Sequence, residues 1–177
     1  MKPSMQATYR SASALVLLGA MMLSASAAVP AGDERFVQNA IRGNYAAIQM
    51  GRLAAAQGTN DEIKTFGRII AQDREKANAQ LLQIANRLGI PAPSRPGPQQ
   101  AQEYQALKHR SGQPFDWRFV MLTAKDYGES VGAYWRHAVG DGKAARYARA
   151  ELPGLWQQGM TARALMAATA SPEPDAP

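Results

Sequence analysis

One long amphipathic stretch, residues 59–88, constrains the fold more than any other part of the chain. Apolar side chains recur there every three or four residues, which is the spacing of one face of an α-helix. Thr59 and Glu62 stand at the spacing of a capping box, so we expect a helix to begin at about Asn60. Gly89, with a proline two residues later, provides the stop. The apolar face consists of Ile63, Phe66, Ile70, Ala77, Leu81, Ile84 and Leu88.

The middle of this apolar face is interrupted by charge. Asp73 falls on the face between Ile70 and Ala77, and Arg74 follows it. A charge on a core face costs several kcal/mol unless it is paired or bound to a ligand. Asp73 and Arg74 are therefore the residues at which we expect a site in this chain.

Other stretches carry the same helical periodicity. We expect long helices over residues 34–57, 116–139 and 143–168, and a shorter one over residues 99–110. Pro153 lies inside the last of these and removes one hydrogen bond at a cost of about 3 kcal/mol, so we expect a kink there and not a break. No stretch alternates between apolar and polar residues with a period of two, so strands are not expected. The sequence predicts an all-α fold.

Local signals predict the ends of these helices and the contacts between them. Asp33 and Asp116 are expected to cap the first and the fourth helix. Gly51 costs on the order of 1 kcal/mol in a helix interior, which makes sense if a neighbouring helix approaches closely there. Gly128 and Gly132 repeat this pattern of small residues. The tryptophans at helical positions are expected to be packing anchors: Trp117, Trp135 and Trp156.

The segment 89–115 divides the helices into two pairs. Its first part, IPAPSRPGP, carries four prolines in nine residues and cannot be helix or central strand. Short loops within each pair predict two helical hairpins, and the connector is long enough to travel the length of a bundle. This pattern predicts a ferritin-like four-helix bundle with a long crossover that contains a short extra helix. The alternative is a simple up-down bundle with the connector looped out.

The first 27 residues have the pattern of a signal peptide. Lys2 and Arg10 form a positive segment, an apolar run over residues 12–23 follows, and Ala25-Ser26-Ala27 fits a signal-peptidase site. We therefore expect a cleaved leader over residues 1–27 and a periplasmic or secreted protein. An uncleaved N-terminal anchor is the alternative, and only in that case would the chain contact the membrane.

The remainder, residues 28–170 with a frayed tail over 171–177, is long enough for one domain with its own core. The chain has no cysteine, so packing alone must stabilise it in an oxidising compartment. Its charges are interleaved and no basic run carries aromatic spacers, so we expect no nucleic-acid partner. Without cysteine, and without a serine that has an evident base nearby, nucleophilic catalysis has no support.

A metal-dependent activity is the kind of catalysis that the sequence leaves possible. Metal sites in the core of ferritin-like bundles use Glu-x-x-His, because a carboxylate and an imidazole three residues apart share one helix face. His109 follows an alanine at that spacing and His137 follows a tyrosine, so both are expected at the surface or at a helix end. An all-oxygen shell for iron or manganese could still come from four carboxylates, Asp73, Asp126, Glu129 and Glu151.

The competing interpretation of the same charges needs no metal. Arginine forms bidentate hydrogen-bonded pairs with carboxylates, and a guanidinium next to a metal ion would repel it. Arg74 would then pair with one of these acids across the helix interface and close the core.

The chain resembles a family of exported bacterial proteins called domain of unknown function 4142, which looks ferritin-like. The resemblance runs from about Asp33 to Leu165. It is carried by the segments FVQNA (36–40), GRLAAAQGTNDEIKTFGRIIAQDREKAN (51–78), SGQPFDWRFV (111–120) and ARAELPGL (148–155). The resemblance implies the same bundle fold.

The resemblance also implies a group of inward polar residues that could together hold a metal, and this chain departs from it. Family members carry Glu at the position of Ala47 and His at the positions of Arg74, Tyr127 and Gln158, whereas Asp73 is kept. The residues found here bind metals poorly or not at all. A degenerate core site is therefore expected at these five positions.

These observations favour an exported bundle without enzymatic activity and without a cofactor. We expect it to act as a structural or protein-interaction module of the cell envelope, with an envelope protein as the kind of partner. The alternative function is a metal-dependent oxidase or metal-storage protein that uses the core carboxylates with iron or manganese.

Overall fold

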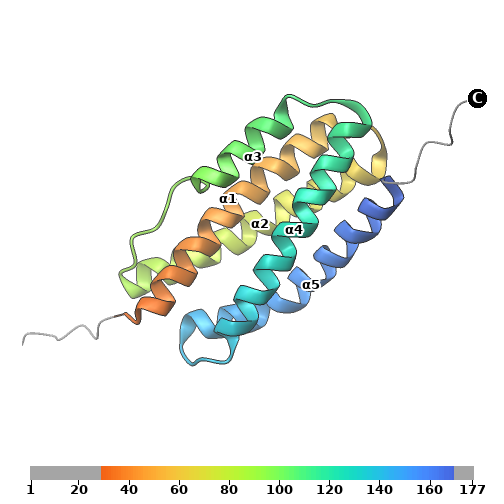
Figure 1. The fold of residues 1–177 in the computed structure, drawn as a ribbon. Coiled ribbons are helices and arrows are strands. Elements are labelled where there is room, and N and C mark those ends of the chain that lie inside the picture. The colour runs from red at the N-terminus through yellow and green to blue at the C-terminus, as the bar shows by residue number, and fades with distance from the viewer. Residues whose placement is uncertain (1–28, 170–177) are drawn as a thin grey trace, which may run out of the picture.

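The computed structural model describes residues 29–169, which form five helices and no strand (Figure 1). The predicted all-α fold class is confirmed. The predicted leader, residues 1–27, and the predicted tail, 171–177, lie outside the described residues. None of the helices in the described range is long and apolar enough to cross a membrane. The helices are α1 (Ala31–Gln57), α2 (Asp61–Leu88), α3 (Pro98–Lys108), α4 (Gly112–Ala138) and α5 (Lys143–Thr169).

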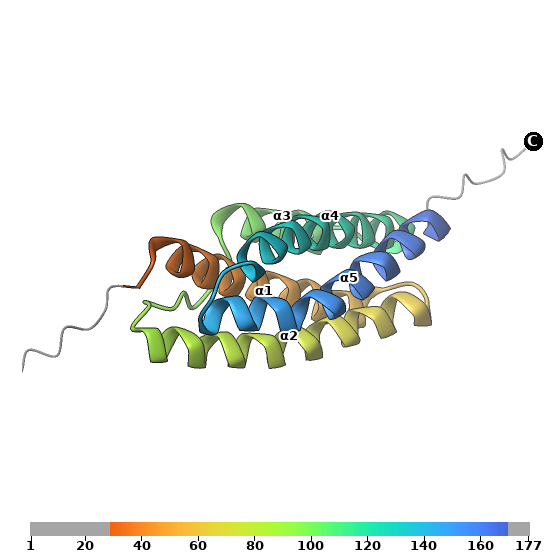
Figure 2. The same cartoon turned by 90° about the horizontal axis from the view of Figure 1, so that it is seen from below.

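The long helices form two antiparallel hairpins, α1 with α2 and α4 with α5 (Figures 1 and 2). A Cβ added at Gly51 of α1 would lie 2.6 Å from the carbonyl oxygen of Gly67 in α2, and one added at Gly67 would lie 2.6 Å from the Gly51 oxygen. The close approach predicted at Gly51 is thus present. Gly128 and Gly132 share the spacing of small residues but make no such approach, since an added Cβ would meet only arginine side-chain atoms, at 3.7 and 3.4 Å.

The connector between the hairpins travels along the length of the helices. At its start, Gln38 Nε2 near the beginning of α1 donates a hydrogen bond to the Pro91 carbonyl, with a distance of 3.1 Å. At its far end, the Thr59 amide, just after α1, donates to Asp116 Oδ1 in α4 at 3.2 Å. α2 and α4 therefore run in the same direction, and α3 lies along α1 between these points (Figure 1). The alternative with a looped-out connector is wrong.

The caps differ from the predicted ones. α2 is capped by Asn60, whose Oδ1 accepts from the Ile63 amide at 2.9 Å, and not by Thr59. α1 begins at Ala31, before Asp33, and Asp33 makes no capping hydrogen bond. α4 begins four residues before Asp116. Asp116 is only 2% exposed and accepts hydrogen bonds from the amide and hydroxyl of Thr59, so it joins α4 to the loop after α1.

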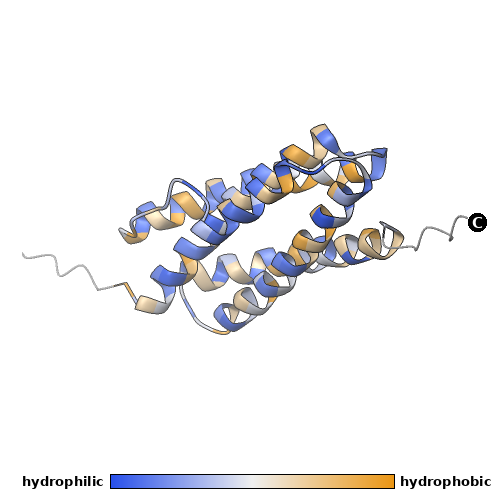
Figure 3. Cartoon of the chain, turned by 45° about the horizontal axis from the view of Figure 1, so that its top comes forward, coloured by the Kyte–Doolittle hydropathy of each residue, from blue (hydrophilic) through white to orange (hydrophobic). Residues whose placement is uncertain are grey.

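Each helix directs its apolar residues inward, and Figure 3 shows hydrophilic and hydrophobic segments alternating along the helices. The prediction that the tryptophans anchor the core was wrong. Trp117, Trp135 and Trp156 are 40%, 69% and 59% exposed, because they occupy outward faces of α4 and α5. α5 runs through Pro153 without a break. The largest fully buried side chains include Phe115, Phe119, Ile41, Ile63, Ile70 and Leu81.

Candidate functional site

A buried polar cluster joins α2, α4 and α5 at the centre of the helical core. Arg74 Nη2 donates to Gln158 Oε1 at 2.9 Å, and the Tyr127 hydroxyl donates to the same oxygen at 2.6 Å. Gln158 Nε2 donates in turn to Asp73 Oδ2 at 2.6 Å. The Arg74 guanidinium carbon also lies 5.5 Å from the centre of the Tyr127 ring, within the range of a cation–π contact. A single carboxamide therefore links a cation, a phenol and a carboxylate.

We had predicted that Asp73 is the charged residue on the core face of α2. The structure shows Arg74 there instead. Arg74 is 4% exposed, whereas the Asp73 side chain is 42% exposed and lies 3.9 Å from Lys76 Nζ. The buried face runs from Ile70 to Arg74 and on to Asn78, a spacing of four residues that keeps these side chains on one side of the helix.

The predicted ion pair of Arg74 was also wrong. Within residues 29–169 no carboxylate lies within salt-bridge distance of its guanidinium. Among residues 29–169, Gln158 is the side chain that accepts a hydrogen bond from Arg74. A neutral carboxamide offsets the cost of burying a cation less well than a carboxylate would. The charge is thus held by a hydrogen bond and by the face of Tyr127.

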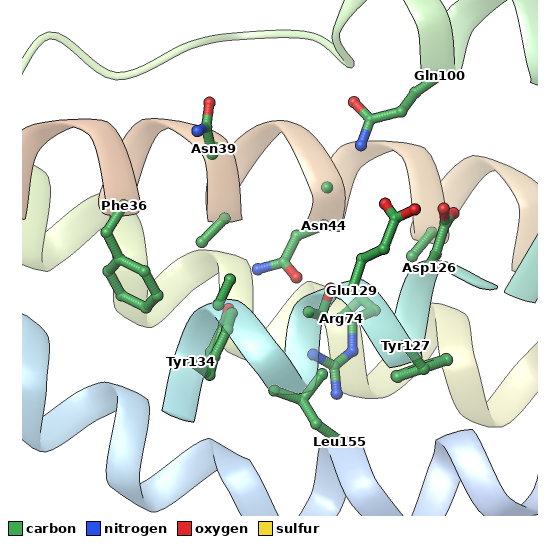
Figure 4. Close-up of a pocket in the computed structure, with 15 residues that line it drawn as sticks. Phe36, Asn39, Asn44, Arg74, Gln100, Asp126, Tyr127, Glu129, Tyr134 and Leu155 are labelled. Carbon is green, nitrogen blue, oxygen red and sulfur yellow. The ribbon is translucent and has the colours of Figure 1, made fainter. Parts of the chain in front are cut away.

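A cavity of about 240 Å³ opens beside this cluster, between α1 and α4 (Figure 4). Arg74 reaches it from α2, Leu155 from α5 and Gln100 from α3. α3 is held near the cavity by an ion pair between Glu103 Oε1 and Lys125 Nζ of α4, 3.2 Å apart. The lining residues are Phe36, Asn39, Ala40, Gly43, Asn44, Ala47, Arg74, Gln100, Asp126, Tyr127, Glu129, Ser130, Ala133, Tyr134 and Leu155.

Two buried hydrogen-bond donors in the cavity wall have no partner among residues 29–169. They are Nδ2 of Asn44, a residue that is 3% exposed, and Nε of Arg74. A buried donor left unsatisfied costs about 1–3 kcal/mol, so such groups in a native protein call for an explanation. Both residues belong to the lining of the same cavity, Asn44 on α1 and Arg74 on α2.

Carboxylates lie at another part of the cavity. Asp126 and Glu129 project from α4 toward Gln100 of α3, away from the Arg74 guanidinium (Figure 4). Partial burial, together with the negative charges of Glu103 and Glu129, raises the pKa of Asp126 to about 6. The pKa of Glu151 is also raised, mainly because this side chain is half-buried, while the Arg74 charge opposes the shift.

The four carboxylates considered as alternative metal ligands, Asp73, Asp126, Glu129 and Glu151, do not converge. Within residues 29–169 no group of three or more His, Cys, Asp and Glu side chains is placed to hold a metal ion. Arg74 lies in the cavity wall beside this region, and its positive charge acts on Glu151.

Aromatic side chains pack at the α1 N-terminal side of the cavity. The Phe36 ring stacks on His137 at 4.0 Å and meets the edge of Tyr134 at 4.9 Å. His137 lies in the last turn of α4, which confirms the predicted position at a helix end. Its side chain is partly buried, and its Nε2 lies 3.1 Å from Asp33 Oδ1 of α1. His109 is exposed at the end of α3, as expected. Burial raises the pKa of Tyr134 to about 12, so its hydroxyl stays protonated at neutral pH.

The structure brings the five residues of the expected degenerate site together. Ala47, Arg74 and Tyr127 line the cavity, and Gln158 and Asp73 continue the hydrogen-bonded cluster behind it. Two further residues were missed as site residues, Asn44 and Tyr134. Asn44 had a signal, since it was the polar residue on the apolar face of the first helix, whereas Tyr134 looked like ordinary core.

The fold and the cavity define an all-helical protein whose core is organised around a buried arginine. The chain belongs to the family described as domain of unknown function DUF4142, whose model matches residues 19–165. None of the curated proteins with which the chain was compared is similar to it.

Two solved structures share this fold. A DUF305 fragment from Deinococcus radiodurans matches with a TM-score of 0.70 and 14% identity, over 78% of this chain and 97% of that one. A DUF305 protein from Streptomyces coelicolor, described as secreted, matches with a TM-score of 0.68 and 14% identity, over 82% of this chain and 96% of that one. At this level of identity the likeness concerns the fold alone.

Proposed function

We propose that the protein is an exported, ferritin-like four-helix bundle that serves as a structural or protein-interaction module of the cell envelope. The observation that carries the proposal is the buried guanidinium of Arg74, which donates a hydrogen bond to Gln158 and lies over the ring of Tyr127. The family resemblance implies metal-ligating side chains at these three positions. A cation fixed there opposes the binding of a second cation, because the two charges repel each other in a medium of low polarity.

The connectivity supports the ferritin-like assignment. Two antiparallel hairpins are joined by a connector that returns along the full length of the helices, which is the one-crossover pattern of ferritin-like bundles. Export is supported by the leader pattern over residues 1–27, with small residues at its end, and by the likeness to a DUF305 protein described as secreted.

An exposed aromatic surface supports an interaction role. Trp156 and Met160 of α5 and Val131 of α4 line a small groove between the two helices, and Trp135 stands one turn beyond Val131. Trp135 and Trp156 are both more than half exposed, and exposed apolar side chains that gather on one surface, tryptophan above all, are typical of protein–protein contact sites. We call these four residues the tryptophan surface and propose that an envelope protein docks on it.

Metal retention tests the absence of a metal centre. The purified protein should carry well below one equivalent of iron, manganese or zinc after dialysis, as measured by elemental analysis, because Arg74 lies where a metal would bind. One equivalent of any of these metals retained through dialysis would overturn the proposal. It would favour the alternative function, a metal-dependent oxidase or storage protein that uses Asp73, Asp126, Glu129 and Glu151.

Photocrosslinking in living cells tests the interaction role. A photoreactive amino acid at position 135 should give a discrete crosslinked species that the same probe at position 80 does not, since Gln80 is an exposed residue on α2, outside the tryptophan surface. Equal labelling at both positions, or none at position 135, would contradict docking at this surface.

A further inference from the structure

We propose that the cavity between α1 and α4 is a binding site for a small amino carboxylate, with its carboxylate against Arg74 and Asn44 and its ammonium group toward Asp126 and Glu129. This goes beyond the envelope role above and does not depend on it.

The inner wall of the cavity is suited to a carboxylate. Arg74 Nε and Asn44 Nδ2 are donors on side chains at least 96% buried, and neither has a partner among residues 29–169. Gln158 already occupies Arg74 Nη2, so the guanidinium keeps its full charge and retains free donor positions. Both donor atoms are shielded from solvent in this structure, so a carboxylate reaches them only if the two side chains shift. It then balances the buried charge, which a neutral water molecule cannot do.

The mouth of the cavity is suited to an ammonium group. Asp126 and Glu129 turn their carboxylates toward Gln100, away from the Arg74 guanidinium (Figure 4). A simple anion would be attracted by Arg74 and repelled by these acids, and a simple cation would meet the reverse. A molecule with a carboxylate at one end and an ammonium at the other is complementary to both.

The walls and the volume limit the ligand further. The lining also contains apolar side chains, Ala40, Ala47, Ala133 and Leu155. At about 240 Å³ the cavity lies below the roughly 300–1,000 Å³ of sites for drug-sized ligands. The ligand is therefore of amino-acid size, with a short apolar segment between its charges or beside them.

Calorimetric titration of the purified protein tests the proposal with defined probes. The amino carboxylates are alanine, 4-aminobutanoate and 5-aminopentanoate, which differ in the separation of their charges, and the controls are butanoate and butylamine. At least one amino carboxylate should bind at least about tenfold more tightly than either control, the factor expected for one additional hydrogen bond to a charged group. The preferred member of the series then gives the separation of the two ends of the site.

Three variants assign the contacts. Arg74→Met keeps the side-chain length without the charge and should weaken binding by about tenfold or more, because charged hydrogen bonds are lost. Glu129→Gln should weaken binding of the amino carboxylate but not of butanoate. Glu62→Gln, an exposed glutamate at the start of α2 outside the cavity, is the matched control and should change neither.

Three results would overturn the proposal. One is the absence of binding by every amino carboxylate at millimolar concentration in a protein whose circular dichroism shows it folded. Another is binding that is unchanged in Arg74→Met. The third is equal binding of butanoate and its amino analogue, which would refute the role of Asp126 and Glu129. If Arg74→Met fails to fold, Glu129→Gln, on the exposed side of α4, still decides the question.

Discussion

Replacing Gln158 with leucine should destabilise the protein strongly, because this one carboxamide satisfies three other side chains. Its oxygen accepts from Arg74 at 2.9 Å and from Tyr127 at 2.6 Å, and its nitrogen donates to Asp73 at 2.6 Å. A hydrogen bond to a charged group is worth about 1.5–3 kcal/mol, and a buried unsatisfied hydroxyl costs about 1–3 kcal/mol. The better burial of leucine offsets part of this, so we expect a net loss of about 3 kcal/mol.

The assay is urea denaturation followed by circular dichroism, with the melting temperature as a second readout. A loss of about 3 kcal/mol corresponds to a fall of about 6–12 °C for a domain of this size. Gln157→Leu, at the neighbouring exposed position of α5, is the matched control and should change stability by no more than about 0.5 kcal/mol.

The double variant Arg74→Met/Gln158→Leu separates the cause from general damage to the core. With the guanidinium gone, leucine no longer strands a buried charge, so the double variant should recover about 2 kcal/mol or more relative to Gln158→Leu. The reasoning is refuted if Gln158→Leu is as stable as the control, or if the double variant is no more stable than Gln158→Leu.

The remaining predictions concern helix packing, the Asp116 contact and pH. Gly67→Ala should destabilise by about 2 kcal/mol or more, because its Cβ would lie 2.6 Å from the Gly51 oxygen. Gly128→Ala, in an exposed part of α4, should stabilise by up to about 1 kcal/mol, and urea denaturation of the two variants measures both changes. Asp116→Ala should cost about 2 kcal/mol in the same assay, because the Thr59 amide and hydroxyl lose their acceptor. The pKa of Asp126 is raised to about 6 in the folded protein from an ordinary value near 3.8, so its ionisation opposes folding, and stability falls as the pH rises from about 4 through 6. Asp126→Asn should therefore stabilise at pH 8 by about 1–2 kcal/mol more than at pH 4, and an equal effect at both pH values would contradict this sign.

The helices could be predicted from the sequence because their signals are local. The spacing of apolar residues, Gly89 and the prolines of the connector define where helices run and stop. The caps could not be assigned in the same way. Asp116 stands where a cap is expected, but its partner is Thr59, 57 residues away, and only the packing of α4 against the end of α1 brings the two together.

The presence of a charged site on α2 could also be predicted from the sequence, but not which residue carries the buried charge. A charge on the apolar face of α2 was evident, but helical periodicity alone does not distinguish a spacing of three from one of four after Ile70, so Asp73 was placed inward in place of Arg74. The prediction that the tryptophans pack in the core was wrong for a related reason. Helical spacing shows that residues share a face, but not whether that face meets another helix, and Trp135 and Trp156 face outward.

The cavity itself had no sequence signal. Its lining includes small residues, Gly43 and Ala47 of α1 and Ser130 and Ala133 of α4, and small residues in a helix predict close packing just as well as a void. The gathering of Ala47, Arg74, Tyr127 and Gln158 was implied by the family resemblance and not by periodicity.

The central claim is that Arg74, Gln158 and Tyr127 occupy core positions at which the family resemblance implies metal ligands, and that the buried guanidinium prevents a metal ion from binding there. The most direct measurement is the metal stoichiometry, by elemental analysis after dialysis with iron or manganese, of the protein beside the variant Ala47→Glu/Arg74→His/Tyr127→His/Gln158→His. The account predicts about one equivalent or more in the folded variant and far less than one in the unaltered protein. Retention of a full equivalent by the unaltered protein would contradict it.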